Sequence, residues 1–331
     1  MLKYEQLSRK PGAFKSMTGI TPDEFQALLT EVRPRHQAAE EQRIANQKRQ
    51  RMPGGGAKSR HDLPQRLLMT LVWLRLYLTC EAVGVIFGVD KSTVSRHTRP
   101  ILCILRDLGA NTLGWPEEAQ ALMKSNHPPS DSPDGTTPCA SGDDTPSPRV
   151  ETQRTDMVAI IDATEQRIER SHHYAVQKDH YSGKKKSHTR KTQIIVNEQG
   201  RIRDVSHSVP GSLHDINLLR HSGALDRLPP EITAMADSGY QGIQDDMPER
   251  SVALPYRASR WHPLTPEQKL HNRDISSIRV VVENTIAALK HFKCLTDVFR
   301  HRIDRYDNVF LAIVGIVNRR IDVRLARLSA T

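Results

Sequence analysis

The sequence is poor in cysteine and aromatic residues and has no long apolar run. Its four cysteines lie far apart without paired spacing, so neither a zinc cluster nor a disulfide framework is indicated. The longest apolar stretches, 67–80 and 309–317, are broken by Arg75 or too short, because spanning a bilayer takes about 20 residues. The amino-terminal residues lack the apolar core of a secretory signal. These absences argue against a membrane protein and against a small disulfide-stapled scaffold, and they predict a cytoplasmic protein.

What is abundant is positive charge. The 331 residues include 48 Lys and Arg against 38 Asp and Glu, which gives a net charge of +10. Part of this charge lies in two basic runs, 33–60 and 178–191. A single run of this kind is most often a solvated surface, but two runs beside the motifs described below favour a nucleic-acid partner.

The composition divides the chain into segments. Thr21-Pro22-Asp23-Glu24 is a helix start, and Pro53-Gly54-Gly55-Gly56 is typical of a hinge. Leucines three and four residues apart predict a helix within 61–78, whereas 125–149 is rich in Pro, Ser and Asp and is expected to be a disordered linker. We therefore predict an N-terminal helical segment with a basic hinge (1–60), a helix-turn-helix domain (61–124), a linker (125–150), a catalytic domain (151–323) and a tail (324–331).

The second half of the chain predicts an α/β domain. Short β-branched runs are typical of strands, and longer amphipathic runs are typical of helices. The strands are expected at 157–161, 193–196, 201–208 and 232–236, and the helices at 213–219, 275–292 and 305–328. This order favours a mixed sheet covered by helices.

Residues 80–98 have the pattern of a helix-turn-helix. Ala82, Val83 and Phe87 are expected to face inward, Gly88 to make the turn, and Asp90 to cap the second helix. An ordinary helical hairpin would satisfy the same spacing. The exposed side of the second helix is polar and basic, which favours DNA binding. The predicted contact residues are Lys91, Ser92, Ser95 and Arg96.

Three acidic residues are candidates for a metal site. Asp162 and Asp237 each follow a predicted strand, and Glu283 lies on the helix 275–292, beside an apolar stripe that includes Ile278. Converging carboxylates repel one another, and a hard divalent cation such as Mg²⁺ or Mn²⁺ relieves that repulsion. Two such ions suit phosphodiester chemistry. Each acid could instead be a helix cap or a surface charge, and spacing alone does not show convergence.

Five ordered motifs between 158 and 318 resemble those of DDE transposases of the bacterial insertion-sequence and Harbinger-like type. They are Asp162-Ala163-Thr164-Glu165, Tyr181-Ser182-Gly183-Lys184-Lys185-Lys186, Pro210-Gly211-Ser212-Leu213-His214-Asp215, Ala236-Asp237-Ser238-Gly239-Tyr240-Gln241-Gly242 and Ile278-Arg279-Val280-Val281-Val282-Glu283. The upstream helix-turn-helix resembles the domain that precedes the catalytic core in this family. The resemblance implies a ribonuclease-H-like core whose metal-binding acids are Asp162, Asp237 and Glu283, with Asp215 as a cap, a neighbouring group or a further ligand.

The predicted function is a DNA transposase that binds two divalent ions. The resemblance implies nicking at terminal inverted repeats by hydrolysis and joining of the freed 3′-hydroxyl to target DNA. Basic residues on the catalytic domain are expected to grip phosphates of double-stranded DNA. They are Lys184, Lys185, Lys186, Arg190, Arg279 and Lys290. A reaction that joins two DNA ends favours a homo-oligomer bound to DNA. A DNA-binding protein of this kind is expected at the nucleoid.

Two alternatives remain. A DNA-binding regulator derived from an inactive transposase would bind the repeats without metal-dependent nicking. A nuclease without joining activity would use the same carboxylates and give no strand-transfer products.

Overall fold

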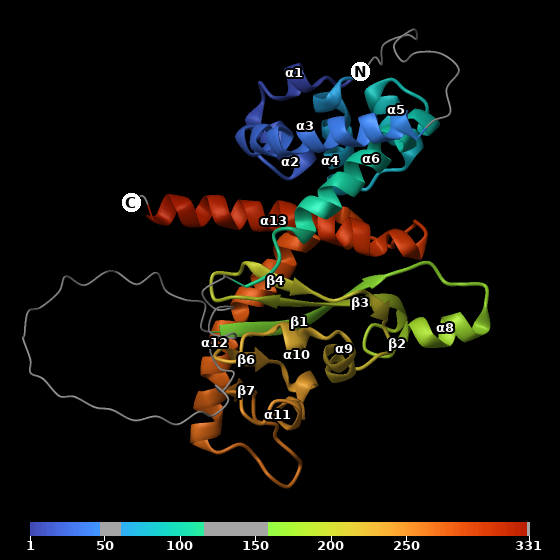
Figure 1. The fold of residues 1–331 in the computed structure, drawn as a ribbon. Coiled ribbons are helices and arrows are strands. Elements are labelled where there is room, and N and C mark those ends of the chain that lie inside the picture. Colours follow the sequence, from blue (N-terminus) through green and yellow to red (C-terminus); the bar gives the residue numbers. More distant parts are fainter. Residues whose placement is uncertain (47–60, 116–157, 330–331) are drawn as a thin grey trace, which may run out of the picture.

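A computed structural model describes residues 1–46, 61–115 and 158–329. Helices from the first part of the chain form a separate layer, one long C-terminal helix lies beneath them, and a mixed sheet with further helices forms the rest (Figure 1). The predicted hinge at 53–56 and the predicted linker at 125–150 lie outside the described residues. In the described segments, no helix is both long and apolar enough to cross a membrane.

The N-terminal layer begins with the helices α1 (Tyr4–Leu7), α2 (Pro11–Thr18) and α3 (Pro22–Ala45). The expected capping box is present, because Thr21 accepts from the Glu24 amide while the Glu24 carboxylate accepts from the Thr21 amide. Helix α4 (Leu63–Leu76) follows, with every side chain from Leu67 to Leu74 buried. A helix that is apolar on all sides is typical of a core position. The helix expected within 61–78 is therefore present, and it is buried on all sides between Leu67 and Leu74.

The helix-turn-helix is confirmed as α5 (Cys80–Phe87) and α6 (Lys91–Ala110). Gly88 between them has a φ of 68°, in the left-handed region that glycine adopts readily. A Cβ on Gly84 would collide with the carbonyl oxygen of Val89, so the tight packing of the turn requires glycine there as well. Asp90 occupies the N-cap position of α6 as expected, but its side chain makes no capping hydrogen bond.

The sheet is mixed, with the strand order β2-β3-β1-β6-β7, and β4 and β5 also pair with β3. β1 is antiparallel to β3 and parallel to β6. Most of the predicted strands are present, with changed ends. The strands are β1 (Val158–Arg167), β2 (Tyr181–Ser182), β3 (Ser187–Val196), β4 (Ile202–Val205), β5 (Val209–Pro210), β6 (Thr233–Ala236) and β7 (Val252–Ala253).

Helices cover both faces of this sheet. Ile160 packs in one apolar cluster with residues of α12 and α13, and Ile161 packs in another with residues of α9 and α10. Successive strand residues point to opposite faces, so each cluster fills one side. The helices and short 3₁₀ turns are α8 (Tyr174–His180), α9 (Asp215–His221), α10 (Ala224–Arg227), η1 (Ser238–Tyr240), α11 (Ile243–Asp246), α12 (Pro266–Lys290), η2 (Lys293–Leu295), η3 (Ile303–Arg305) and α13 (Tyr306–Ser329). This is the mixed α/β architecture expected of a ribonuclease-H-like core.

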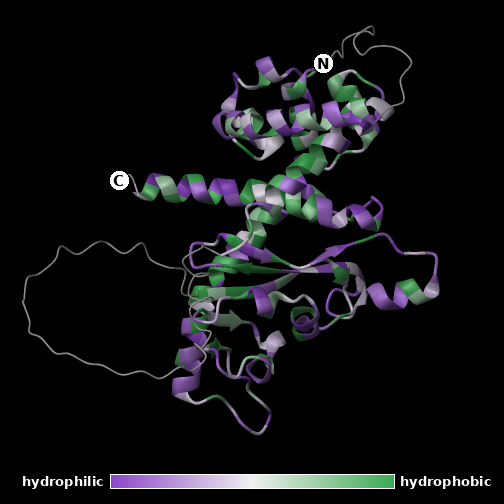
Figure 2. Ribbon diagram, viewed as in Figure 1, coloured by the Kyte–Doolittle hydropathy of each residue, from purple (hydrophilic) through white to green (hydrophobic). Residues whose placement is uncertain are grey.

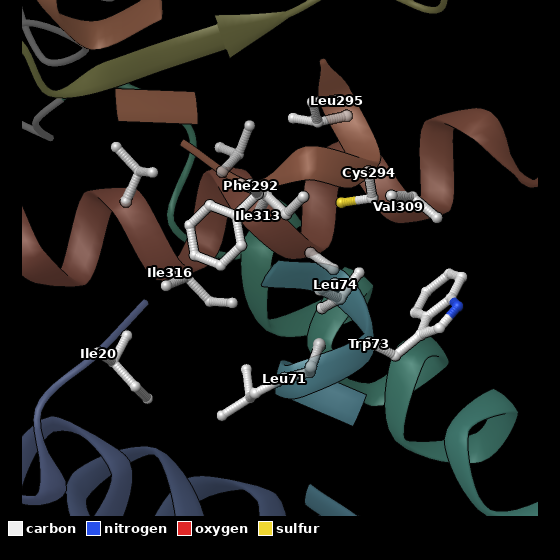
Figure 3. Close-up of a cluster of buried hydrophobic side chains, with 14 of the residues drawn as sticks. Ile20, Leu71, Trp73, Leu74, Phe292, Cys294, Leu295, Val309, Ile313 and Ile316 are labelled. Carbon is white, nitrogen blue, oxygen red and sulfur yellow. The ribbon is translucent and has the colours of Figure 1, made fainter. Parts of the chain in front are cut away.

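Helix α13 joins the N-terminal layer to the sheet. It crosses α6 at two facing glycines, where a Cβ on Gly315 would lie 2.6 Å from the Cα of Gly109. Apolar side chains of α4, α13 and the segment after α12 meet at this junction (Figure 3). Hydrophobic residues also concentrate in the central strands (Figure 2). The division into domains at the predicted boundaries stays a prediction, because one apolar cluster includes residues from both halves of the chain.

Candidate functional site

Asp162 and Asp237 lie side by side on neighbouring strands. The parallel pairing of β1 and β6 ends with Ile161 opposite Ala236, and the two aspartates are the next residues along the chain. Parallel strands are about 4.8 Å apart, so the two side chains leave the sheet at one place. The expectation that Asp162 ends its strand was wrong, because β1 continues to Arg167 along β3. Only β6 ends here.

Each of these aspartates accepts a hydrogen bond from the amide that follows it. The distances are 2.8 Å from Ala163 N to Asp162 Oδ1 and 2.6 Å from Ser238 N to Asp237 Oδ1. Burial raises the pKa of Asp162, the Ala163 amide and Arg279 lower it, and the charges of Asp237 and Asp215 raise it further. The acids therefore act on one another electrostatically.

Asp215 is the first residue of α9, which packs on the face of the sheet opposite to α12 and α13. Its Oδ2 would lie 3.0 Å from a Cβ on Gly239, so it sits against the turn that follows Asp237. Its Oδ1 lies 2.8 Å from Lys191 Nζ, which also donates to the carbonyl of Leu213 at 2.6 Å. Asp215 thus already has a positive partner.

Lys191 also connects Asp215 with the sheet. Lys191 and Glu165 are cross-strand partners in the β1–β3 ladder, and their charged groups are 3.6 Å apart with both side chains 8% exposed. Thr189 donates to the other Glu165 oxygen at 2.8 Å. Our sequence reasoning missed Lys191. Its position opposite Glu165 depends on strand register, which the spacing of the motifs does not give.

Helix α12 presents two cations toward the aspartates. Arg279 lies 3.6 Å from Asp237 and is 15% exposed. Burial and the nearby charge of Lys185 lower the pKa of Lys290, whereas Asp162 and Glu165 raise it. Of the predicted phosphate-binding residues, Arg279 therefore pairs with Asp237, and Lys290 interacts electrostatically with Asp162 and with Lys185.

Glu283 lies between these cations on the same helix. It follows Arg279 by four residues and precedes Lys290 by seven, so the three share one flank of α12. Its side chain is exposed, and in the described part of the chain no three His, Cys, Asp or Glu residues are close enough to hold a metal ion. The structure therefore brings Asp162 and Asp237 together and places Glu283 nearby without joining it to them.

Ile278 was assigned to the buried stripe of this helix, and that was wrong, because it is 37% exposed while Ile275 is buried.

Two other predicted phosphate contacts differ from each other. Lys184, Lys185 and Lys186 are exposed in the turn between β2 and β3, as a phosphate contact requires. The Arg190 guanidinium is half-buried and donates to the hydroxyl and carbonyl of Ser208, at 2.8 and 2.7 Å. Its visible role is to hold β5 on β3, and its contact with DNA stays a prediction.

The second helix of the helix-turn-helix exposes most of the predicted DNA contacts. Lys91, Ser92 and Arg96 are exposed, whereas Ser95 is half-buried. Arg96 donates to Ser92 Oγ at 3.1 Å, which orders both side chains on the helix surface. Arg99 is also exposed and follows Ser95 by one turn, so the helical period extends the candidate surface to it.

Comparison with known proteins agrees with this arrangement. Residues 161–318 match the family described as DDE superfamily endonuclease, and residues 62–111 match the helix-turn-helix of DDE superfamily endonuclease. The chain is 26% identical over 323 residues to a probable transposase for insertion sequence element IS702 of Microchaete diplosiphon, covering 97% of this chain and 98% of that protein. No solved structure matches the chain. The paired aspartates, the exposed recognition helix and these matches together show that the chain belongs to the DDE superfamily of endonucleases and transposases, with an N-terminal helix-turn-helix.

Proposed function

We propose that the chain is a metal-dependent DNA transposase that binds terminal inverted repeats, nicks them and joins the 3′-hydroxyl to target DNA. The observation that carries this proposal is the register of β1 and β6, which sets Asp162 beside Asp237 under the cations of α12. The IS702 relative is named a probable transposase, and its match spans both parts of this chain.

Asp162 and Asp237 supply neighbouring carboxylate oxygens of the kind that a divalent cation binds. Asp162, Asp237 and Asp215 repel one another, and oxygen ligands on a hard cation such as Mg²⁺ or Mn²⁺ would relieve this repulsion. We assign the metal to Asp162, Asp237 and Glu283. Asp215 lies next to this site, and we assign its carboxylate to the ion pair with Lys191 rather than to the metal. Two bound ions would supply an activated water or 3′-hydroxyl and stabilise the departing oxygen.

The chain's own residues would hold the DNA. Arg279 and Lys290 flank Glu283, so a scissile phosphate at the aspartates would meet positive charge on the α12 side. The lysine turn 184–186 would hold the strand beside it, and α6 would enter a major groove of the repeat. Because the repeats come in pairs, we propose that a homo-oligomer forms on DNA.

A plasmid carrying the terminal repeats, incubated with the protein and Mg²⁺, tests the proposal. We expect nicks and strand-transfer products from the wild type, and at least 100-fold less product from Asp162→Asn, Asp237→Asn and Glu283→Gln. Asp274→Asn is the matched control, because it lies on the opposite side of α12 from Glu283 and is exposed. A gel shift with the same DNA accompanies each variant. Full binding without any nicking would instead identify a DNA-binding regulator, and nicking without joining would identify a nuclease.

A further inference from the structure

The loop between β7 and α12, residues 254–265, carries an exposed tryptophan. Trp261 is 80% exposed, whereas Trp73 and Trp115 are each 7% exposed. An indole has one of the largest apolar surfaces among side chains, and it is normally buried or placed in an interface. Neither the metal site nor the helix-turn-helix uses Trp261.

The base of this loop is fixed beside the aspartates. Arg257 donates to the carbonyl of Ser238, the residue after Asp237, at 2.5 Å. The side-chain amide of Gln241 donates from Nε2 to the carbonyl of Pro255 at 3.1 Å. Both contacts join the loop to the turn that follows β6, so the loop and Asp237 share one support.

The other side of the loop is fixed to α12. The amide of Tyr256 donates to Asn272 Oδ1 at 2.8 Å, and Asn272 Nδ2 donates to the Tyr256 carbonyl at 2.9 Å. The rings of Tyr256 and His271 also lie 5.0 Å apart. Since α12 also carries Arg279 and Glu283, the loop is attached to both elements that build the site.

The tip of the loop is closed and presents a cation with the indole. Ser259 and His262 exchange backbone hydrogen bonds of 3.1 and 3.3 Å across the tip. Arg260 and Trp261 lie between them, both exposed, with the guanidinium 5.3 Å from the indole ring centre. The loop contains two arginines and no acidic residue. An aromatic face beside positive charge, on an acid-free loop, fits a base with its phosphate.

The loop can reach DNA at the aspartates. Trp261 is four residues from Arg257, so their Cα atoms are at most about 14 Å apart. Figure 1 shows this loop at the end of the molecule opposite the helix-turn-helix, next to the first turns of α12. Its ligand is therefore the strand held at the site rather than the sequence that α6 reads.

We propose that Trp261 and Arg260 form a stacking platform for an unpaired nucleobase of the DNA strand held at the Asp162–Asp237 edge. This inference rests on the proposed function, because it supposes that DNA lies at that edge. A base leaves its stack only where the duplex is opened, so the platform selects DNA that is frayed or single-stranded next to the site of cleavage.

A binding experiment without metal tests the platform apart from catalysis. Two oligonucleotides of equal sequence are compared, a blunt duplex and a duplex with a short 3′ overhang that carries 2-aminopurine. The full-length wild type is expected to bind the overhang more tightly and to quench its fluorescence. Trp261→Ala is expected to bind the overhang about 5- to 100-fold more weakly, with the blunt duplex unchanged.

Two further variants make the result specific. Trp261→Phe keeps an aromatic face and is expected to retain most of the preference for the overhang. Tyr174→Ala removes another aromatic side chain that is 80% exposed, on α8, and is expected to change neither affinity. Equal weakening of both duplexes by Trp261→Ala, or no weakening, would overturn the platform. Loss of cleavage in Asp162→Asn does not affect this test, since binding is measured without Mg²⁺.

Discussion

Lys191 is a buried cation between two carboxylates, and it shows how one residue can organise the site. It joins Glu165 on β1 to Asp215 at the start of α9, and its own side chain is 8% exposed. Removing one member of a buried charged group leaves the others without compensation, which costs more than the interaction itself contributes.

Lys191→Met is therefore expected to lower the free energy of unfolding by about 3 kcal/mol, because Glu165 and Asp215 lose their counter-ion. Urea unfolding followed by circular dichroism measures the change. The double variant Lys191→Met with Glu165→Gln should recover part of the loss, since one buried charge is then removed. Lys178→Met, at an exposed lysine, is the control. A loss for Lys191→Met no larger than for Lys178→Met would contradict the proposed role.

His97 on α6 predicts a dependence of stability on pH. Burial, together with the charges of Arg66, His61 and Arg96, lowers its pKa to about 4. The folded chain stays unprotonated at His97 until the pH reaches about 4, whereas an unfolded histidine takes up its proton near pH 6.5. The contribution of His97 to the free energy of unfolding is therefore fully present above pH 6.5 and is lost as the pH falls toward 4.

We expect the melting temperature of the wild type to fall more steeply between pH 7 and pH 5 than that of His97→Gln. Thermal melts of the two proteins, and of the exposed-site control His172→Gln, measure this difference. Parallel curves for the wild type and His97→Gln would show that protonation of His97 is not coupled to folding.

The crossing of α6 and α13 packs the second helix of the helix-turn-helix against the C-terminal helix. A Cβ on Gly109 would collide with the carbonyl oxygen of Leu311, and the contact is backbone to backbone. Gly109→Ala must therefore separate the helices, and overpacking of this kind costs about 1 to 3 kcal/mol. Gly12→Ala is a matched control, because Gly12 also lies in a helix but has open space around it. Urea midpoints should fall for Gly109→Ala and stay equal or rise for Gly12→Ala.

The elements that the sequence predicts well are those specified by local signals. The capping box at Thr21 and the left-handed glycine at Gly88 each depend on a few adjacent residues, and both are present. The extension of β1 past Asp162 depends instead on pairing with β3 and on distant partners. Gln166, for example, donates to the carbonyls of Cys294 and Asp297, both at 2.8 Å. No local pattern contains such a contact.

The candidate site divides in the same way. Asp162 and Asp237 could be found because each follows an apolar strand-forming run, which is a local signal. The register that sets them side by side depends on which strands become neighbours. The same holds for the pairing of Lys191 with Glu165 and for the hydrogen bond from Arg190 to Ser208. The exposure of Ile278 likewise depends on which face of α12 meets the sheet, because Ile275 and Val282 are buried while Ile278 is 37% exposed.

At the scale of the whole molecule, α13 connects the helical layer with the sheet. Asn318 of α13 is fully buried, accepts from the amide of Ile202 on β4 and donates to its carbonyl, both at 2.9 Å. It also donates to Thr112, just after α6, at 3.0 Å. One side chain therefore joins the recognition helix, the C-terminal helix and the sheet.

This connection predicts that the two parts of the chain unfold together. Trp73 reports on the helical layer, and Trp115 packs in the apolar cluster on the far side of the sheet. In proteins that keep only one of these tryptophans, fluorescence should give the same urea midpoint. Asn318→Ala leaves the amide and carbonyl of Ile202 without their partner, at a cost of about 2 kcal/mol or more, and should lower both midpoints equally. Different midpoints for the two single-tryptophan proteins, or a shift of only one of them on Asn318→Ala, would show that the helix-turn-helix and the sheet are independent units.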